Sequence, residues 1–556
     1  MTGFSELADT IVDELLASQP TAATFLGDHR FDAELEDLSD SAVRAEADRL
    51  RRRRDELAAL AASSGGGPAD AEERVDLAQL GHAVDARLFA LTELREHEWD
   101  PLVYNPGYAL NLLVAREHAP AAERLEALAG RLAAIPDLVA TARRQLTDCP
   151  AIHTQTAVDQ LSGTLGLVRD EIGGMLDKEP NLRPAVDPAR KAAFEALTGL
   201  RNWLRDSLPA ASRDPRLGRA LYERKLAYSL DSAMTARETL DAAYAALDRV
   251  SAEIAEVAAE LAGEPVPAAA GERAALVRRV LDDLAQSRPD DSSIVGKATA
   301  ALADTTAFVR DRDLVTVLDD PIEVIVMPEF ARGVAVAYCD APGPLETSVV
   351  PTFYAISPTP KDWSPERVAS FYREYNDHQM RNMTVHEAMP GHALQLAHAR
   401  RYRGSSRARA FCSSGSFVEG WAVYGEQVMA AAGYGGLPVR MQQLKLQLRM
   451  VINAILDQLT HCEGLAEEDA MALMTGRGFQ EEGEAAGKWR RAQLTSAQLS
   501  TYFVGYTEVS AIGAARPAGT GLREWHDAMV GHGSPAPRHL RQLLTESANN
   551  EQSGPA

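Results

Sequence analysis

Two histidines and a glutamate lie close together in one short stretch, and side chains of these types can bind a metal and catalyse hydrolysis. His386 directly precedes Glu387, and His392 follows six residues after His386. Imidazole nitrogens are common zinc ligands, and a carboxylate beside the metal can act as a general base. In the helical H-E-x-x-H motif, the histidines are four residues apart and share one face. The stretch therefore has the composition of a zinc hydrolase site, but with a longer spacing.

The six-residue spacing does not fit an uninterrupted helix. Six residues correspond to a rotation of about 600°, so the rings would point about 120° apart, with a rise of about 9 Å between them. Pro390 disrupts a helix because its ring clashes with the carbonyl four residues back, which belongs to His386. Gly391 adopts backbone angles that other residues avoid. We therefore expect Met389-Pro390-Gly391 to interrupt the helix and to bring His392 back towards His386.

A third metal ligand is expected on the next helical segment, because catalytic zinc sites generally use three protein ligands and leave one position open. The segment 416–426 follows a cluster of serines and glycines, and it contains Glu419, 27 residues after His392. Glu426 lies two helical turns further on, so the two carboxylates share nearly one face. We predict that Glu419 binds the metal and that Glu426 supports the site, for example by a hydrogen bond to a metal-binding histidine.

These motifs resemble those of a known family. The pattern His386-Glu387-x-x-Pro390-Gly391-His392, followed by Glu419-Gly420-Trp421-Ala422-x-Tyr424-x-Glu426, is similar to the DUF885 family of bacterial proteins. Weaker matches to the same family are the stretch from Gln19 to His29, the motif formed by Gln498, Tyr502 and Gly505, and Trp525-His526-Asp527. The resemblance implies a zincin-like protein, related to the HExxH metallopeptidases, with a glutamate as the third ligand.

The composition is that of an acidic soluble protein. The chain has 556 residues, enough for a large core or for two or more packed subdomains. Asp and Glu number 80 against 57 Lys and Arg, and the net charge of −23 disfavours nucleic acid or anionic membrane as a partner. The four cysteines form no C-x-x-C pair, which argues against a disulfide framework or a thiolate zinc site. Without a signal-peptide pattern or an apolar stretch of about 18 residues, a cytoplasmic location is expected.

Most of the chain has the pattern of amphipathic helices, which predicts a mainly α fold with a large multi-helix body. Segments rich in Ala, Leu, Arg and Glu run from 5 to 62 and then, in several pieces, from 71 to 287. The Pro- and Gly-containing loop at 263–267 suggests a division into an N-terminal helical half, 1–265, and a catalytic half, 266–556. One continuous helical domain is the alternative.

Three short segments interrupt the helical pattern before the histidines. They are rich in β-branched and aromatic residues, bounded by Pro or Gly, and span 322–328, 333–338 and 352–356. We expect a small β-sheet beside the active-site helix, which would begin with Ser364 as its cap and Pro365 as its first residue. An edge strand of this sheet is able to pair with an extended peptide substrate. A sheet that only supports the helix is an equal alternative.

Both motif acids also have a purely structural explanation. Thr384 and Glu387 have the spacing of a helix capping box, and so do Ser416 and Glu419. Capping leaves unexplained why two histidines flank Glu387 across a Pro-Gly break, with an acid-bearing helix after them. We therefore favour the metal site.

A hydrolase also needs a group that stabilises the oxyanion, and Tyr502 is the first candidate. Gln498, Tyr502 and Gly505 would share one face of a helix, a spacing that ordinarily reflects core packing. In zinc peptidases, a Tyr or His outside the motif commonly donates to the developing oxyanion. The match to the family places Tyr502 before Tyr506 and His526 for this role.

Together these residues predict a zinc-dependent metallohydrolase that cleaves peptide bonds, in short peptides or at a peptide terminus. His386, His392 and Glu419 would hold Zn²⁺. Glu387 would transfer the proton, and Tyr502 would stabilise the oxyanion. One alternative is a zinc amide hydrolase acting on a peptide-like small metabolite. Another is a helical scaffold or binding protein without catalytic activity.

Overall fold

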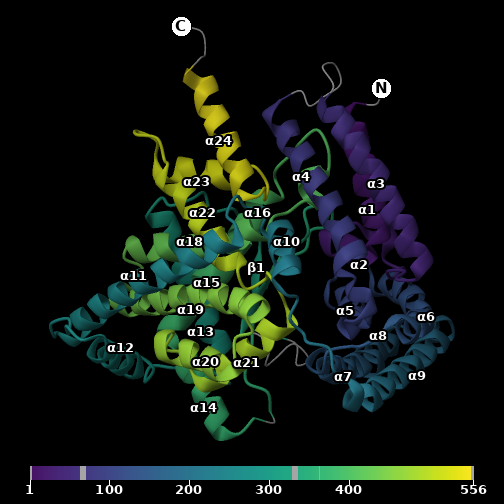
Figure 1. Cartoon of the computed structure of the whole chain (residues 1–556), viewed down its shortest axis with the longest axis horizontal. Helices are drawn as coiled ribbons and strands as arrows, with labels where there is room; N and C mark the ends of the chain where they lie inside the picture. Colours follow the sequence, from purple (N-terminus) through teal and green to yellow (C-terminus); the bar gives the residue numbers. More distant parts are fainter. Residues whose placement is uncertain (1–2, 63–69, 328–335, 362, 553–556) are drawn as a thin grey trace. The chain divides into compact units, whose positions relative to one another are not determined.

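The protein is mainly helical, as predicted, and it forms two compact units (Figure 1). The computed structural model describes residues 3–62, 70–327, 336–361 and 363–552. The first unit comprises Met1–Pro215, Pro342–Val350 and Gly404–Cys412, and the second comprises Arg216–Ala341, Pro351–Arg403 and Ser413–Ala556. The division expected after residue 265 falls inside the second unit, between α11 (Ala236–Ala262) and α12 (Ala270–Leu284). Helix α11 packs into the same core as the helices of the motif.

Amphipathic helices build the first unit. They are α1 (Phe4–Ser18), α2 (Pro20–Leu26), α3 (Asp40–Ala62), α4 (Ala71–Phe89), α5 (Gly107–Ala115), α6 (Ala121–Gln145), α7 (Ala151–Gly166), α8 (Ile172–Lys178), α9 (Arg183–Ser207) and the short α17 (Ala408–Phe411). In α1, Ile11, Leu15 and Leu16 are buried on one face, as the spacing indicated. The later helices share a second apolar core, in which α6 packs against α9.

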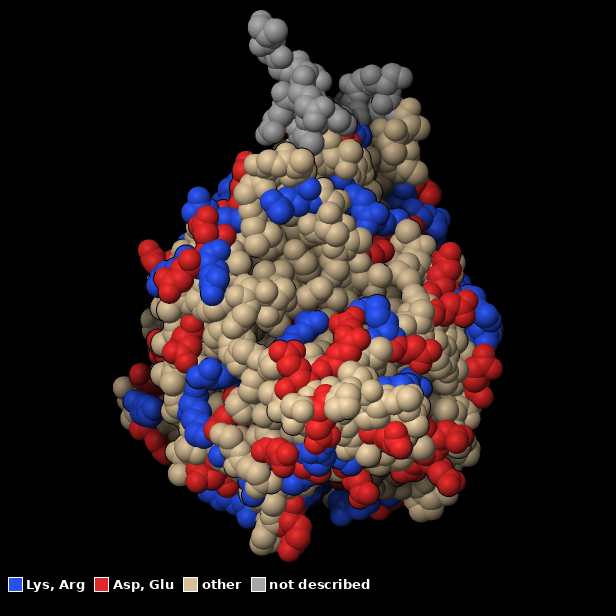
Figure 2. Space-filling view, turned by 90° about the vertical axis from the view of Figure 1, so that its left-hand side faces the viewer, with Lys and Arg blue, Asp and Glu red and all other residues tan. Residues whose placement is uncertain are grey.

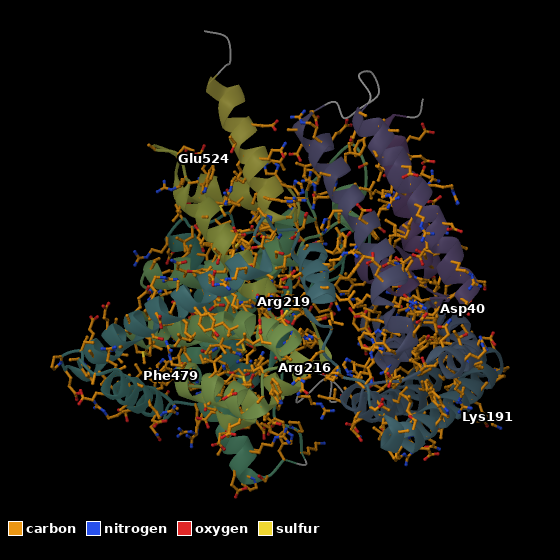
Figure 3. The ribbon with its side chains drawn as sticks, in the orientation of Figure 1. Asp40, Lys191, Arg216, Arg219, Phe479 and Glu524 are labelled. Atoms are coloured by element: carbon orange, nitrogen blue, oxygen red, sulfur yellow. The ribbon has the colours of Figure 1, made fainter. Side chains whose placement is uncertain are left out.

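The second unit contains the motif segments. Its helices are α10 (Arg219–Leu230), α11 (Ala236–Ala262), α12 (Ala270–Leu284), α13 (Ile294–Asp311), α14 (Pro365–Glu374), α15 (Asp377–Glu387), α16 (His392–Ala399), α18 (Gly415–Ala431), α19 (Gly436–Glu463), α20 (Glu467–Ala472), α21 (Glu482–Leu494), α22 (Thr501–Ala514), α23 (Leu522–Val530) and α24 (Pro537–Gln552). The first residue of this unit is Arg216 (Figure 3). Arg219 is the first residue of α10 and forms an ion pair with Glu463 of α19. Because α15 packs against α13, α18 and α19, the histidine-bearing helix is surrounded by other helices.

The expected small sheet is present in the second unit. Strand β3 (Thr352–Ile356) lies in the centre, parallel to β1 (Ile322–Val326) and antiparallel to β2 (Ala337–Asp340). The first part of the predicted strand 333–338 lies outside the described residues. The sheet lies beside the histidine-bearing helix, because the Tyr354 hydroxyl of β3 is 3.1 Å from that of Thr384 in α15.

The helix expected to run from Pro365 into the motif is in fact two helices. Ser364 caps α14 by accepting a backbone N–H, as predicted. The helix then ends at Glu374, and the Asn376 side chain accepts the backbone N–H groups of two following residues and so starts α15. An asparagine in this position is a strong N-cap, which is why the chain begins a new helix there.

Charged side chains of both signs are mixed on the face of the molecule in Figure 2. Around a broad uncharged area in the upper centre of this view, Lys and Arg lie next to Asp and Glu, and neither sign forms a continuous region. None of the described helices combines the length and the apolar character needed to cross a lipid bilayer.

Candidate metal centre

The helix that carries His386 is interrupted where the sequence indicated. α15 ends one residue after this histidine, and α16 begins at His392 with Gly391 as its cap. A Cβ atom on Gly391 would lie 1.8 Å from the carbonyl oxygen of His386, so only glycine lets the chain turn back this closely. The indole of Trp421 on α18 donates a hydrogen bond of 2.8 Å to the Pro390 carbonyl and holds the turn in place.

The interruption brings three candidate ligands together. The rings of His386 and His392 lie with their centroids 4.7 Å apart and their planes at 87°. The Nε2 atom of each ring is 3.5 Å from Oε2 of Glu419, and ligand atoms of all three residues lie within 4.8 Å of one another. Bonds of about 2.0–2.2 Å from N and O ligands to one zinc ion are compatible with such separations.

The atoms of this cluster fit a divalent metal. Among the residues that the structure describes, Oε2 of Glu419 has no hydrogen-bond partner although the atom is buried. A buried carboxylate oxygen without a partner is costly unless a cation satisfies it. The Glu419 side chain as a whole is 23 % exposed and that of His386 15 %, so part of each side chain is accessible to solvent. Nitrogen and oxygen donors with room for a further ligand are typical of a catalytic zinc site.

A second carboxylate fixes the orientation of His386. Nδ1 of His386 is 2.8 Å from Glu426, and the Asn382 amide donates a 2.6 Å hydrogen bond to the other oxygen of this carboxylate. Such a carboxylate selects the tautomer of a metal-binding histidine and makes it more basic. The structure thus places Glu426 beside His386, and its role in supporting a metal ligand stays a prediction. Sequence reasoning missed Asn382, although its position four residues before His386 on the same helix face could have indicated it.

The charges of the cluster favour a positive charge between its members. Burial alone would lower the pKa of His386, but Glu419 and Glu426 outweigh it and raise this pKa well above its usual value. Burial would likewise raise the pKa of Glu419, but the two histidines hold it far below its usual value. The carboxylate is therefore ionised and available to a cation.

The structural explanations for the two motif acids are wrong. Ser414 caps α18 by accepting a backbone N–H, and Ser416 lies inside the helix. Thr384 also lies inside its helix, where its hydroxyl donates to a backbone carbonyl one turn back. Glu387 and Glu419 therefore belong to no capping box, and neither carboxylate accepts a hydrogen bond within the described ranges.

Two glycines bring Tyr502 towards the cluster. A Cβ atom on Gly505 would lie 2.0 Å from the carbonyl oxygen of Ser416, and one on Gly420 would lie 2.4 Å from the carbonyl carbon of Gly505. This contact lets α18 and α22 cross closely, with Glu419 directly before one glycine and Tyr502 one turn before the other. The charge of Glu419 is the main cause of a raised pKa at Tyr502, so the phenol stays protonated and able to donate.

Replacing Gly505 with alanine is expected to lower the free energy of unfolding by about 1–3 kcal/mol, because the added methyl group forces the crossing apart. Chemical denaturation of the purified chain measures this change. Gly487→Ala in α21 is the matched control, because a Cβ atom there meets nothing within 4 Å. The control should be neutral or stabilising by up to about 1 kcal/mol. Equal unfolding midpoints for the two variants would contradict the close crossing.

The other candidates for the oxyanion are engaged elsewhere. The Tyr506 hydroxyl bonds two glutamine amides at 2.8 and 3.0 Å. His526 is buried, with one ring nitrogen 3.0 Å from a tyrosine hydroxyl and the other 2.7 Å from a backbone carbonyl. Among the residues with described positions, the Tyr502 hydroxyl has only a long contact of 3.5 Å from the Gln498 amide. The expected shared helix face is wrong for Gln498, because α22 begins at Thr501.

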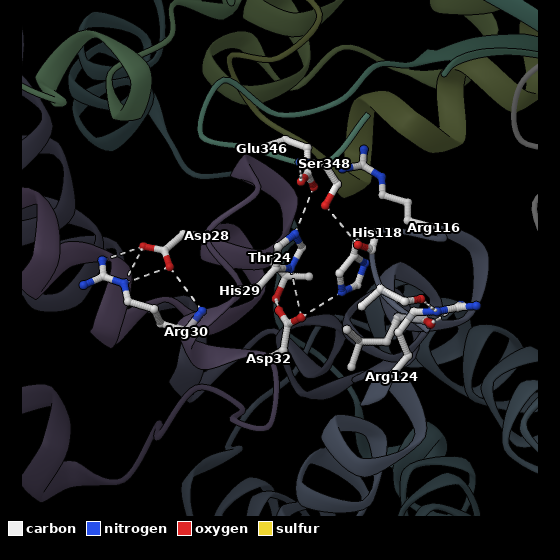
Figure 4. Close-up of polar contacts among 12 residues, drawn as sticks. Thr24, Asp28, His29, Arg30, Asp32, Arg116, His118, Arg124, Glu346 and Ser348 are labelled. Carbon is white, nitrogen blue, oxygen red and sulfur yellow. Dashed lines mark hydrogen bonds and ion pairs between the residues drawn. The ribbon is translucent and has the colours of Figure 1, made fainter. Parts of the chain in front are cut away.

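A second cluster of possible metal ligands lies in the first unit, and sequence reasoning missed it (Figure 4). Oδ2 of Asp32 is 2.9 Å from Nδ1 of His29 and 3.1 Å from Nε2 of His118. The other nitrogen of His29 is 2.9 Å from Glu346, on the segment that returns to this unit after β2. His29 ends the N-terminal stretch that resembles the family, so the motif was visible, but two of its partners are distant in sequence.

Ring geometry distinguishes this cluster from the group formed by His386, His392 and Glu419. The rings of His29 and His118 are stacked, with centroids 3.8 Å apart and planes at 2°. The lone pair of an imidazole nitrogen lies in the ring plane, and two parallel planes share no point where one ion can bind both. The distances to Asp32 are those of ordinary hydrogen bonds, unlike the 3.5 Å separations around Glu419. We therefore interpret the cluster of the first unit as a proton-sharing network.

The His29 network should make the stability of the first unit depend on pH. Burial opposes each shift, but the contacts with Asp32 and Glu346 raise the pKa of His29 and lower the pKa of Glu346. The pKa of Asp32 is lowered first by His118 and then by His29. The stability that protonated His29 contributes is fully present below its usual pKa of 6.5. It is lost as the pH rises through the raised pKa of the folded state. The acid contribution is complete above about 4.5, the usual value for glutamate, and disappears as the pH falls.

Replacing His29 with glutamine is expected to lower the unfolding free energy by about 1–3 kcal/mol between pH 4.5 and 6.5 and by less at alkaline pH. Denaturant titrations across this range measure the difference. Glu346→Gln should also make the unfolding free energy less dependent on pH, because it removes one of the two carboxylates that contact His29. If the unfolding free energy of both variants changed with pH as it does in the native protein, the network would not be the source of the pH dependence.

Helical fold and site together define a mainly α protein with a His-His-Glu cluster suited to a divalent cation. The chain belongs to the family described as "Bacterial protein of unknown function (DUF885)", whose sequence model matches residues 20–544. The comparison with curated proteins found no match.

Solved structures share this fold over nearly the whole chain. One is "a putative lipoprotein of unknown function" from Shewanella oneidensis, with a TM-score of 0.79 and 27 % identity, covering 98 % of this chain and all of that one. Another is "the putative lipoprotein from Colwellia psychrerythraea", with a TM-score of 0.80 and 16 % identity, covering 98 % of this chain and 99 % of the other. The second likeness, at this identity, concerns the fold alone.

Proposed function

We propose that this protein is a zinc-dependent metallohydrolase that cleaves peptide bonds of short peptides or at a peptide terminus. The observation that carries the proposal is the Oε2 atom of Glu419, which is buried without a hydrogen-bond partner among the described residues, 3.5 Å from Nε2 of both His386 and His392. The resemblance of the two motifs to zincin-like proteins supports the same assignment.

Each residue of the site has a task in this proposal. His386, His392 and Glu419 hold the metal, which supplies Lewis acidity for a carbonyl group and for water. Glu387 is the last residue of α15 and is half-buried. Within the described part of the chain it forms no ion pair, so no cation competes with a water molecule for its carboxylate. It accepts the proton of the attacking water and returns it to the leaving nitrogen. Tyr502 donates its phenolic proton in a hydrogen bond to the oxyanion.

A peptide-library digest analysed by mass spectrometry, together with metal analysis of the purified protein, tests the proposal. We expect about one zinc per chain, cleavage of a defined set of peptides, and loss of cleavage when a chelator is added. Recovery of cleavage on adding Zn²⁺ back separates metal removal from unfolding. Bound zinc without any peptide cleavage would favour an amide hydrolase acting on a peptide-like metabolite, and protein with no affinity for zinc would favour a non-catalytic scaffold.

A further inference from the structure

Two basic side chains that have no acidic partner among the described residues lie on one face of α21. Lys488 and Arg491 are three residues apart in this helix. The Lys488 side chain is buried and, in the part of the chain that the structure describes, forms no hydrogen bond or ion pair. Arg491 is half-buried and donates a 2.8 Å hydrogen bond to the neutral amide of Gln498. In a protein with a net charge of −23, the missing partners do not reflect a shortage of acids.

The neighbouring charges are paired with each other. Arg449 forms an ion pair with Glu484, and Lys445 is 2.8 Å from Glu374. These acids are therefore engaged, and a cation buried without a partner is costly. The cost is visible in Lys488, whose pKa lies well below its usual value because burial and the positive charge of Arg449 both disfavour the ammonium form. An incoming anion would supply the missing negative charge.

A short chain of contacts links these cations to the metal centre. The Gln498 amide that accepts the hydrogen bond from Arg491 lies 3.5 Å from the Tyr502 hydroxyl. The charges of both Arg491 and Glu419 act on the pKa of Tyr502, Arg491 lowering it and Glu419 raising it more strongly. The Gln498 amide therefore lies between the guanidinium of Arg491 and the phenol of Tyr502. An anionic group bound by Arg491 would be close to the bond that the metal centre is proposed to cut.

We propose that Arg491 and Lys488 bind a carboxylate of the substrate next to the scissile bond. The planar guanidinium can hold a carboxylate by two parallel hydrogen bonds, and the ammonium can add a third. The carboxylate belongs either to the C-terminus of a short peptide or to an Asp or Glu side chain. This inference rests on the proposed function for the identity of the bond that is cut, whereas the binding of the carboxylate is independent of turnover.

Calorimetry with the full-length Glu387→Gln variant tests the subsite by binding alone. The probes are N-acetylated tri-alanine as the free acid and as the C-terminal amide. We expect the free acid to bind about tenfold or more tightly than the amide, and Arg491→Gln to abolish this preference. Lys488→Met should weaken it while leaving the fold intact, because it replaces a buried amine with an apolar side chain of similar length. Arg490→Gln is the matched control, an exposed neighbour that should change nothing.

Equal affinity for acid and amide, or a preference that survives both Arg491→Gln and Lys488→Met, overturns the inference. An amidated acetyl-alanyl peptide ending in glutamate separates the two sources of the carboxylate, because it binds like the free acid only if a side chain is accepted. Cleavage assays with the wild-type protein separate this inference from the proposed function. Cleavage of acid and amide at equal rates removes the subsite but keeps the hydrolase, whereas preferential acid binding without any cleavage keeps the subsite but removes the hydrolase.

Discussion

Replacing Glu387 with glutamine is expected to reduce peptide hydrolysis by about 10²–10⁴-fold while leaving the zinc content unchanged. Glutamine has the shape of glutamate but cannot accept the proton of the attacking water. Metal binding should persist, because Glu387 lies outside the group formed by His386, His392 and Glu419. The measurements are kcat/KM for a peptide found in the library digest, and the metal content of the same preparation by elemental analysis.

The control for this variant is Glu366→Gln, an exposed glutamate in the first turn of α14 that should keep full activity. Since both substitutions remove one negative charge, a general electrostatic effect would act on both. Full turnover by Glu387→Gln with native zinc content would show that another group transfers the proton. Loss of zinc from this variant would instead make Glu387 a metal ligand.

The grouping of His386, His392 and Glu419 could be predicted from the sequence because its signals are local. The distance between His386 and His392 depends on a proline and a glycine that lie between them, and Glu419 and Glu426 share a face through the period of their own helix. The capping assignments failed because Ser416 fits a cap as well as Ser414 does in sequence. Only the backbone hydrogen bond of the folded chain decides between them.

The residue pattern alone does not place Tyr502 near Glu419, and only the resemblance to the family singled it out. The approach of the two residues depends on the crossing of two helices far apart in sequence. Gly420 and Gly505 make this crossing possible, but a glycine within a helical pattern does not indicate its partner. The division into two units was not predicted for the same reason, because it depends on contacts between segments far apart in sequence. The loop at 263–267 marks the end of a helix, whereas the segments 342–350 and 404–412 return to the first unit without a composition that predicts it.

Removing the third ligand by Glu419→Ala is expected to abolish tight zinc binding and, with it, all zinc-dependent hydrolysis. Two histidines alone leave the site one ligand short of the usual three. Glu426→Gln should have a smaller effect, about 10–100-fold in metal affinity or activity, because it weakens the support of His386 and removes no ligand. Competition with a chromophoric chelator measures both affinities, and circular dichroism reports whether each variant keeps its helical content.

The loss of zinc affinity should be larger for Glu419→Ala than for Glu426→Gln, and this order tests the roles of the two acids. The order follows from their different positions on α18. Oε2 of Glu419, which has no hydrogen-bond partner within the described segments, is 3.5 Å from the Nε2 atoms of both histidines, whereas Glu426 bonds His386 and Asn382. If Glu419→Ala bound zinc as tightly as the native protein while Glu426→Gln lost it, the roles of the two acids would be reversed. If neither substitution changed zinc affinity, any bound zinc would lie elsewhere, and the orphaned oxygen of Glu419 would need another explanation.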